Sequence, residues 1–195
     1  MIPRTEFTKR LKQAFWDHGY DQLTMTGLAK AIDLTRRSLY NYFSNKEDAF
    51  RFAIDQGNIS AVKLGIDAGR AKLKSGANAI EVLTTVIDIR YGENRRNLML
   101  SPHATELNDQ AFRRCRDLMI ESAISFQAQL ADLIIELQQA RRLMLKPGVT
   151  PAGLAQLVAD GARGANQGLP SVAVDDLERR YRAMVATLLY GAAHA

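Results

Sequence analysis

The fold is decided by residues 24–47, TMTGLAKAIDLTRRSLYNYFSNKE. This stretch contains two short segments with apolar residues at helical spacing, which predict helices at Met25–Ile32 and Arg36–Phe43. Each segment is preceded by a threonine, Thr24 or Thr35, and threonine caps helix N-termini by accepting a hydrogen bond from a backbone N–H. Two short helices joined by a turn of a few residues are typical of a helix-turn-helix.

A helix before this stretch would complete a three-helix unit. Over Thr5–His18 the apolar residues fall on one helical face, and Gly19 follows as a helix-stopping residue. The turn between the two short helices passes through Asp33 and Leu34, and residues 46–48, KED, open a longer helix with acids in its first turn. We therefore predict a three-helix domain at residues 1–50.

The rest of the chain, residues 51–195, is also predicted to be helical, so the expected fold class is all-α. Five prolines leave long proline-free stretches in which apolar residues recur every three or four positions. Alternating runs of β-branched residues, which favour strands, are scarce. Beyond residue 57 we expect helices near 59–74, 79–91, 94–100, 109–143, 151–167 and 175–190. The clearest N-terminal helix signals are at Asp109, Thr150-Pro151 and Asp175.

Composition limits the class of protein. The 195 residues are 47% hydrophobic and 24% charged, as in ordinary globular proteins, and the net charge is +5. The basic excess is spread along the chain, so it permits a polyanionic partner without locating one. The single cysteine, Cys115, excludes an internal disulfide. We expect a cytoplasmic protein without a membrane span, because no signal-peptide core and no uninterrupted apolar run of about 18 residues is present.

The second short helix has two contrasting sides. At about 100° per residue, Leu39 and Phe43 define the side that is buried, and Tyr42 lies between the two sides. Arg37 and Asn41 point away from the buried side, with Arg36 and Tyr40 beside them. This exposed face is expected to carry two guanidiniums, an amide and a phenol, which can donate hydrogen bonds to base edges or phosphates. From spacing alone, an ordinary solvated helix face remains the alternative interpretation.

Residues 19–29, GYDQLTMTGLA, and 34–47, LTRRSLYNYFSNKE, resemble the N-terminal domain of the tetracycline-repressor (TetR) family. The shared elements are the glycine-aromatic pair after the first helix, the capping threonine and the tail L-Y-x-Y-F-x-x-K-E. The resemblance covers about residues 5–50. It implies a DNA-binding transcriptional regulator, most simply a repressor, that binds a palindromic operator as a homodimer and is released by a small-molecule effector.

The resemblance also implies which residues contact DNA. Base or phosphate contacts are implied for Arg36, Arg37, Ser38, Tyr40, Asn41 and Tyr42, and phosphate contacts for Thr24, Thr26, Thr35 and Lys46. Two positions depart from the family pattern: Asp33 stands where the turn often has glycine, and Arg37 stands where a small residue is common. The bulk of Arg37 means that no known operator sequence can be transferred to this chain.

In the family, the last two long helices form the dimer interface. Here residues 151–167 and 175–190 each carry a stripe of apolar and small residues at helical spacing. The predicted interface residues are Leu154, Leu157, Val158, Gly161, Ala165, Tyr181, Met184, Val185 and Leu188. The alternative is that both stripes pack inward within one subunit. The resemblance makes residues 51–195 the effector-binding and dimerisation domain.

The family also places an apolar cavity for a small effector in this second domain. The candidate lining residues are Tyr91, Met99, His103, Cys115, Met119, Phe126 and Leu130, joined by Ile120 and Ile134. Taken singly, each of these residue types is more often an ordinary core residue. The sequence does not identify the effector, and it predicts no cofactor.

An enzyme or a metal centre is not expected. The pair His103 and Glu106 has helical i, i+3 spacing, but no second pair completes a metal site. Cys115 stands among three arginines, which could lower its pKa and favour oxidation sensing, or it could be a structural cysteine. No nucleophile, base and orienting group assemble. The alternative function is a helical module that binds small molecules or proteins without binding DNA.

Overall fold

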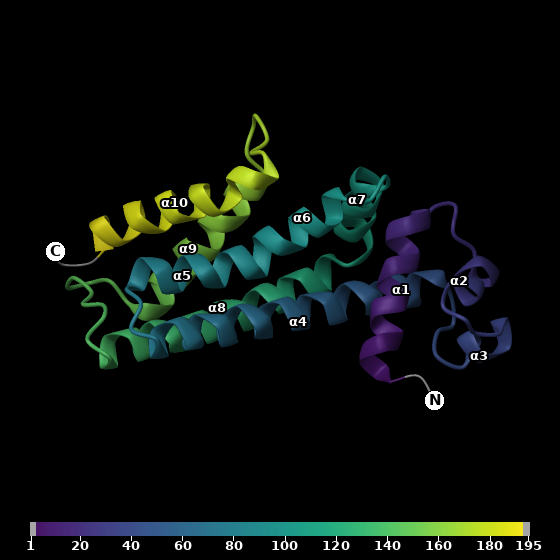
Figure 1. Cartoon of the computed structure of the whole chain (residues 1–195), viewed down its shortest axis with the longest axis horizontal. Helices are drawn as coiled ribbons and strands as arrows, with labels where there is room; N and C mark the ends of the chain where they lie inside the picture. Colours follow the sequence, from purple (N-terminus) through teal and green to yellow (C-terminus); the bar gives the residue numbers. More distant parts are fainter. Residues whose placement is uncertain (1–2, 193–195) are drawn as a thin grey trace. The chain divides into compact units, whose positions relative to one another are not determined.

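The computed structural model describes residues 3–192. The chain divides into two compact units, and we describe each separately. Unit 1 comprises residues up to 59 together with 97–121, and unit 2 comprises residues 60–96 and 122 onward. Over residues 3–192 the structure contains ten α-helices, one π-helical and one 3₁₀ segment, which confirms the all-α prediction (Figure 1).

Unit 1 is built from α1 (Arg4–His18), α2 (Met25–Ala31), α3 (Arg36–Tyr40), the beginning of α4 (Lys46–Lys74), α7 (Ala104–Arg114) and the first turn of α8 (Arg116–Gln139). Its core is unusually aromatic. Phe15 contacts Phe50 and Tyr20 at ring-centroid distances of 5.0 and 6.2 Å, and Phe7 lies 6.0 Å from Phe43. Such ring pairs add to the stabilisation that comes from apolar burial alone. This core holds the two short helices in place.

Both short helices begin where the sequence predicts. The backbone N–H of Gly27 donates to Thr24 Oγ1 at 3.1 Å, and the N–H of Ser38 donates to Thr35 Oγ1 at 3.0 Å. Between them, Asp33 adopts the left-handed conformation with φ of 58°, a geometry that aspartate tolerates better than most residues.

The end of the second short helix differs from the prediction. α3 ends at Tyr40 rather than at Phe43. The N–H groups of Asn41 and Tyr42 bond the carbonyls of Ser38 and Leu39, three residues back, so the last turn tightens. Asn41 and Tyr42 therefore follow the helix instead of belonging to it.

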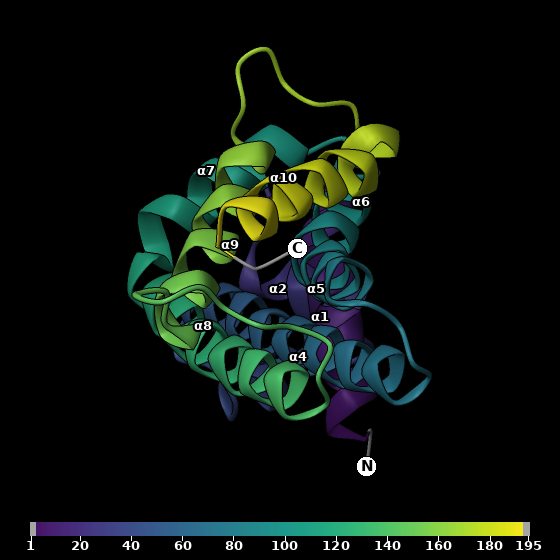
Figure 2. The same ribbon diagram turned by 90° about the vertical axis from the view of Figure 1, so that its left-hand side faces the viewer.

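Unit 2 contains the rest of α4 and α8 with α5 (Ala79–Ile87), the π-helical segment η1 (Asp88–Glu93), the first half of α6 (Asn94–Met99), α9 (Pro151–Asn166), the 3₁₀ segment η2 (Val174–Asp176) and α10 (Leu177–Ala192). Figure 2 shows α10 lying against α9 and α5, and both contacts are extensive. Residues from all these α-helices except α6 fill one apolar core, centred on Phe126, Leu130 and Tyr181. α9 starts as predicted, with Thr150 as N-cap and Pro151 at the first position.

Three predicted boundaries in this part of the chain are wrong. The helix that starts at Lys46 runs to Lys74 without the expected break near residue 57, because burial on both sides of Gly57 outweighs the modest helix penalty of glycine. Residues 79–99 are helical throughout, with η1 inserted between α5 and α6. The expected helix 109–143 instead begins at Ala104 and is interrupted at Cys115.

The compact units are also drawn differently from the predicted domains. Residues 97–121 cluster with the N-terminal helices, although they lie far beyond residue 50 in sequence. The predicted assignment of DNA binding to residues 1–50 and effector binding to 51–195 concerns function and stays a prediction.

One described helix, α8, is long and apolar enough to cross a membrane by length and composition. A single such helix is a weak indication, since core helices of soluble proteins have the same composition. Its residues Phe126, Leu130 and Ile134 are fully buried in the core of unit 2.

Two glycines of α4 give a matched test of the packing of unit 2. A Cβ added at Gly65 would lie 2.9 Å from the carbonyl oxygen of Val86, whereas one added at Gly57 would meet no atom within 4 Å. Gly65→Ala should therefore lower the free energy of unfolding by about 1–3 kcal/mol. Gly57→Ala should raise it by about 0.5–1 kcal/mol, because alanine favours the helix. Urea unfolding of both variants checks the two signs, and equal effects would contradict the close approach at Gly65.

Candidate nucleic-acid interface

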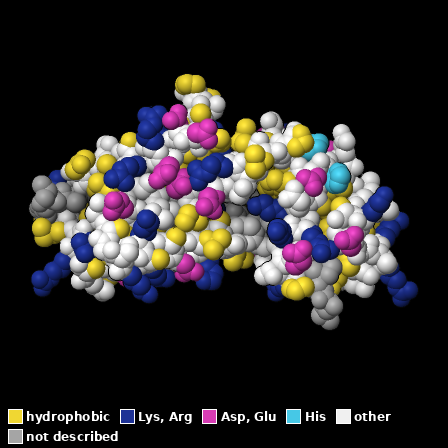
Figure 3. All heavy atoms as spheres, in the orientation of Figure 1, with side chains coloured by type: hydrophobic (Ala, Val, Ile, Leu, Met, Phe, Trp, Pro, Cys, Tyr) yellow, Lys and Arg dark blue, Asp and Glu magenta, His cyan; other side chains and the backbone are white. Residues whose placement is uncertain are grey.

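The exposed side of α2 and α3 carries the candidate interface. Leu39 is fully buried in the core of unit 1 and Phe43 is nearly so, as predicted. Arg36 and Arg37 are exposed, and within residues 3–192 neither forms an ion pair with an acid. Figure 3 shows Lys and Arg side chains projecting at the end of unit 1 where Figure 1 places α2 and α3. The guanidiniums are thus free to bind an anion.

Most of the other predicted DNA-contact residues also lie at the surface. Thr24, Thr26, Thr35, Tyr40, Asn41 and Tyr42 are exposed, and Ser38 is partly buried. The guanidinium carbon of Arg36 lies 5.4 Å from the centre of the Tyr40 ring, so the two side chains lie together. Tyr42 packs its ring 5.0 Å from that of Phe7 while 61% of the residue stays exposed, so it serves both sides as its position in the sequence suggested.

The capping hydroxyl of Thr24 keeps a proton to donate, whereas that of Thr35 also lies 2.8 Å from Ser38 Oγ and shares a hydrogen bond with it. In each cap the hydroxyl oxygen of Thr24 or Thr35 accepts a backbone N–H. A hydroxyl that accepts one hydrogen bond can still donate another, and a phosphate oxygen is a suitable acceptor.

Lys46 is placed differently from its predicted role as a phosphate ligand. Its ammonium donates to the carbonyl oxygens of Tyr20 and Asp21 at 2.7 and 3.3 Å, and it lies 4.3 Å from the centre of the Tyr20 ring. Burial lowers the pKa of this ammonium, against the opposing effect of Asp21. In this structure Lys46 ties the loop after α1 to the start of α4.

A polar brace connects residues 97–121 to the helix-turn-helix within unit 1. We use this name for the contacts made by Ser101, Glu106, Gln110, Arg114 and Asp117. Glu106 accepts from the backbone N–H of Asp21 at 2.7 Å, and Gln110 donates to the Asp21 carboxylate at 2.9 Å. Ser101 donates to the carbonyl of Trp16. The loop that precedes α2 is therefore held by the second segment of unit 1.

The brace continues at the start of α4. Arg114 pairs with Glu47, and its guanidinium carbon lies 4.6 Å from the centre of the Tyr20 ring. Arg51 forms a two-point pair with Asp117, with N···O distances of 2.9 and 2.5 Å, and also donates to the Arg114 carbonyl. The sequence does not predict these contacts, because the residues that form each of them are 63–89 positions apart. No local spacing signals such a contact.

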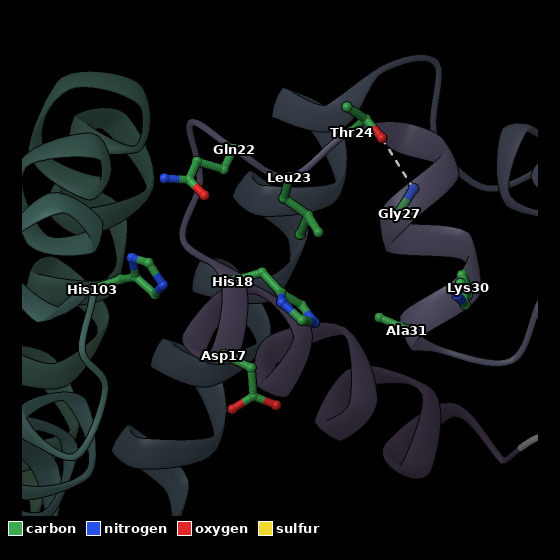
Figure 4. A pocket seen from close by; sticks show the side chains of 9 residues that line it. All are labelled: Asp17, His18, Gln22, Leu23, Thr24, Gly27, Lys30, Ala31 and His103. Carbon is green, nitrogen blue, oxygen red and sulfur yellow. Dashed lines mark hydrogen bonds between the residues drawn. The ribbon is translucent and has the colours of Figure 1, made fainter.

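A hollow of about 600 Å³ lies beside α2 in unit 1 (Figure 4). It is lined by Asp17, His18, Gln22, Leu23, Thr24, Gly27, Lys30, Ala31 and His103. The ring nitrogen Nδ1 of His103 lies 3.4 Å from Glu106 Oε2, so the pair expected from spacing does form. Among residues 3–192, no group of three or more His, Cys, Asp or Glu could hold a metal ion, and His194 lies outside the described residues.

The effector-pocket candidates fall into the two separate units. Tyr91, Phe126 and Leu130 lie in unit 2, where the rings of Tyr91 and Phe126 meet edge to face at 5.7 Å. His103, Cys115, Met99 and Met119 lie in unit 1, as does Ile120, while Ile134 is in the core of unit 2. Whether they line one cavity stays a prediction.

Cys115 is a core residue of unit 1. Its side chain is fully buried, and burial raises the pKa of its thiol to about 11. The opposing effects of Arg51 and Arg114 are smaller. The hypothesis that neighbouring arginines lower this pKa is therefore wrong, because desolvation of the thiolate outweighs their charge.

The candidate dimer residues are divided between core and surface. Leu154, Val158, Tyr181 and Val185 are fully buried inside unit 2, so this part of the stripe packs within the subunit, as the alternative interpretation had it. Leu157 is 54% exposed, and Gly161, Ala165, Met184 and Leu188 are partly exposed. The interface stays a prediction, and only the second group has surface to offer to another copy.

Comparison with known proteins identifies a family for the helix-turn-helix segment. Residues 10–51 match the family described as "Bacterial regulatory proteins, tetR family". The match covers α2, α3 and their caps. The chain carries a TetR-family N-terminal domain. A comparison with curated proteins finds no match.

Solved structures show that the TetR-like fold extends over nearly the whole chain. A transcriptional regulator from Cytophaga hutchinsonii has a TM-score of 0.70 at 16% identity, over 96% of this chain and 97% of its own. FadR from Thermus thermophilus, a TetR-family repressor solved with lauroyl-CoA, has a TM-score of 0.62 at 17% identity, over 97% of this chain and 94% of its own. SmeT, the repressor of the Stenotrophomonas maltophilia multidrug efflux pump SmeDEF, has a TM-score of 0.63 at 12% identity, over 100% of this chain and 92% of its own. These identities establish a shared fold alone.

The brace generates a pH prediction. The guanidinium of Arg51 lowers the pKa of the Asp117 carboxyl from 3.8 to about 2. Because the folded pKa lies below the unfolded value, the pair stabilises the protein at neutral pH and its contribution is lost as the pH falls from about 4 towards 2. Carboxyl ¹³C titration should give Asp117 a midpoint near 2, and Arg51→Gln should return it towards 3.8. An unshifted midpoint in the wild-type protein would show that the pair is absent in solution.

The burial of Cys115 generates a second prediction. DTNB is a disulfide reagent that reacts with an exposed thiolate. At pH 8, Cys115 should therefore react with it at least about 100-fold more slowly in the native protein than in the protein unfolded in guanidinium chloride. Absorbance at 412 nm follows both reactions. Fast reaction of the native thiol at neutral pH would instead support an oxidation-sensing role.

Proposed function

We propose that this protein is a DNA-binding transcriptional regulator that recognises duplex DNA with the exposed side of α2 and α3. The observation that carries the proposal is the pair of exposed guanidiniums of Arg36 and Arg37, which pair with no acid among residues 3–192; Arg37 lies on the side of α3 away from the buried Leu39. Arginine can bond the O6 and N7 atoms of guanine with two hydrogen bonds, and Asn41 has the amide that suits adenine. The TetR-family match of residues 10–51 supports this assignment.

The capping residues are assigned to the DNA backbone. Thr24 and Thr35 lie at helix N-termini, where a hydroxyl and free backbone N–H groups together favour phosphate oxygens. Thr26, Ser38, Tyr40 and Tyr42 are assigned to flanking contacts. Lys46, whose ammonium already has two carbonyl acceptors, is assigned to holding the helix-turn-helix together rather than to DNA.

The protein would act as a homodimer. One helix-turn-helix reads only a few base pairs, whereas a two-fold pair reads half-sites about 34–36 Å apart on a palindromic operator. The exposed side of α9 and α10 is the proposed contact, with Leu157, Gly161, Met184 and Leu188 at its surface. Regulation by a small effector, most simply release of a repressor, completes the proposal. We also propose that the protein is cytoplasmic and has no enzymatic activity.

The polar brace suggests how an effector could act on DNA binding. Residues 97–121 are continuous in sequence with η1 and α6 on one side and with most of α8 on the other. A change in these elements would therefore move the groups that hold Asp21 and Glu47, the two ends of the helix-turn-helix. An effector releases DNA only if it binds better to the conformation in which α3 is misplaced.

Substitutions on α3 test the proposal. A random duplex library should yield a preferred sequence, and Arg37→Ala or Asn41→Ala should reduce discrimination at a given base pair by about 1–3 kcal/mol. The matched control is Arg182→Ala, an exposed arginine of α10. Fluorescence anisotropy with the selected duplex and a scrambled one, in 50–300 mM KCl, should also show affinity falling steeply with salt for the wild-type protein.

Two outcomes would contradict the proposal. If Arg37→Ala and Asn41→Ala bind as the wild-type protein does, the interface lies elsewhere. If no duplex is retained even in dilute salt, the alternative of a helical binding module without DNA binding is favoured.

A further inference from the structure

Arg90 is the most deeply buried charged side chain among residues 3–192. It lies in the π-helical segment η1 of unit 2 and is only 7% exposed. One terminal nitrogen, Nη2, donates to Ser122 Oγ at 2.9 Å, and the buried Nε has no hydrogen-bond partner. A buried guanidinium in proteins is ordinarily matched by an anion, because its isolated charge is costly to desolvate.

Other arginines of the chain show what is missing at Arg90. Several are matched to a carboxylate at hydrogen-bond distance, and all of those are more exposed than Arg90. The pairs are Arg10 with Glu6, Arg51 with Asp117, Arg70 with Glu136, Arg96 with Asp88, Arg114 with Glu47, Arg163 with Asp160 and Arg179 with Asp176. Within the described part of the chain, Arg90 has no such acid.

Of the two acids on η1, Glu93 is exposed and Asp88 is already paired. Both carboxylate oxygens of Asp88 accept hydrogen bonds from Arg96, at 3.0 and 2.8 Å. On the other side, Arg163 of α9 adds a second positive charge, itself paired with Asp160. The surroundings of Arg90 are therefore deficient in negative charge.

Aromatic rings form the remaining surroundings of Arg90. The guanidinium carbon lies 5.0 Å from the centre of the Tyr91 ring and 5.9 Å from that of Phe126. These rings favour a cation, although by much less than a carboxylate would. Burial lowers the pKa of Arg90 and raises that of the Tyr91 hydroxyl, so both groups favour an arrangement in which Arg90 meets an anion and Tyr91 remains a hydrogen-bond donor.

The backbone here is also unusual. η1 interrupts what would otherwise be one continuous helix from Ala79 to Met99, and π-helical turns occur frequently at functional sites. The turn is fixed on both sides, since Arg96 holds Asp88 and Arg95 donates to the carbonyls of Asn166 and Val172. A segment fixed on both sides thus holds the Arg90 guanidinium against the rings of Tyr91 and Phe126.

We propose that unit 2 binds a small organic carboxylate, whose carboxylate pairs with the Arg90 guanidinium and whose apolar body lies against Tyr91 and Phe126. The planar fork of arginine matches a carboxylate with two parallel hydrogen bonds. A single guanidinium with hydroxyl neighbours suits one negative charge better than a phosphate dianion. This inference rests on the proposed function, since it names the chemical class of the effector.

Benzoate and octanoate are the probes for this site, each compared with its neutral counterpart, benzyl alcohol or 1-octanol. Calorimetry and thermal unfolding of the full chain, at constant ionic strength, should show that at least one acid binds and raises the Tm while its alcohol does not. Arg90→Met should weaken that binding about 10- to 100-fold, the range expected for a charged hydrogen-bonded pair. Arg179→Gln, at an exposed arginine of α10, should change nothing.

The ligand-free stability of Arg90→Met separates a binding role from a structural one. Because methionine removes an unmatched buried charge, its Tm should equal or exceed that of the wild-type protein. If this variant does not fold, Arg90→Lys is the second variant, because it keeps the charge without the planar fork. It should bind the acid about 10-fold more weakly than the wild-type protein does. Unchanged binding by a folded variant, or failure of both acids to bind better than their alcohols, overturns the proposal.

Anisotropy with duplex DNA on the same samples keeps this inference separate from the proposed function. If the protein binds the carboxylate through Arg90 but binds no duplex DNA, the proposed regulatory function is contradicted and the carboxylate site is supported. If the protein binds duplex DNA but neither carboxylate, the regulatory function is supported and the carboxylate site is contradicted.

Discussion

The burial of Leu39 is the constraint on which the candidate interface depends. α3 has only five residues, too few to be stable alone, and its orientation is set by one fully buried side chain and the nearly buried Phe43 that follows. Once Leu39 faces the aromatic core of unit 1, helical geometry directs Arg37, two residues before it, to solvent. The apolar core and the basic surface are thus two consequences of one packing contact.

That packing contact does not hold the helix-turn-helix alone. The loop before α2 is fixed by Lys46 from α4 and by Glu106 and Gln110 from α7, and α4 is fixed to the second segment through Arg51 and Arg114. Most of these contacts are partly exposed ion pairs and hydrogen bonds, each of which contributes little by itself. Polar contacts of modest strength can shift with a small change in free energy, whereas an apolar core cannot. This is the property that a regulated connection requires.

The sequence predicted what depends on neighbouring residues. The caps at Thr24, Thr35 and Thr150 and the left-handed turn at Asp33 are local features, and helical periodicity alone placed Leu39 inside. The features that it missed depend on distant partners. Lys46 has a basic side chain next to the helix-turn-helix, and only the tertiary fold shows that its ammonium donates to the carbonyl oxygens of Tyr20 and Asp21. The interruption at Cys115 and the π-helical segment at Arg90 have no local sequence signal that would distinguish them from continuous helix.

Arg90 shows how a fold can retain an energetically unfavourable group. An apolar side chain of similar volume would leave unit 2 more stable, since a buried unmatched charge lowers the free energy of unfolding. The neighbours reduce that cost only in part: two aromatic rings face the cation and Ser122 accepts one hydrogen bond, while the available acid, Asp88, is held by Arg96. An anion that binds here would gain the full attraction of a guanidinium already desolvated and oriented. The same unfavourable burial in the free protein therefore favours a ligand of the right charge, because the cost of desolvating the guanidinium has already been met in the fold.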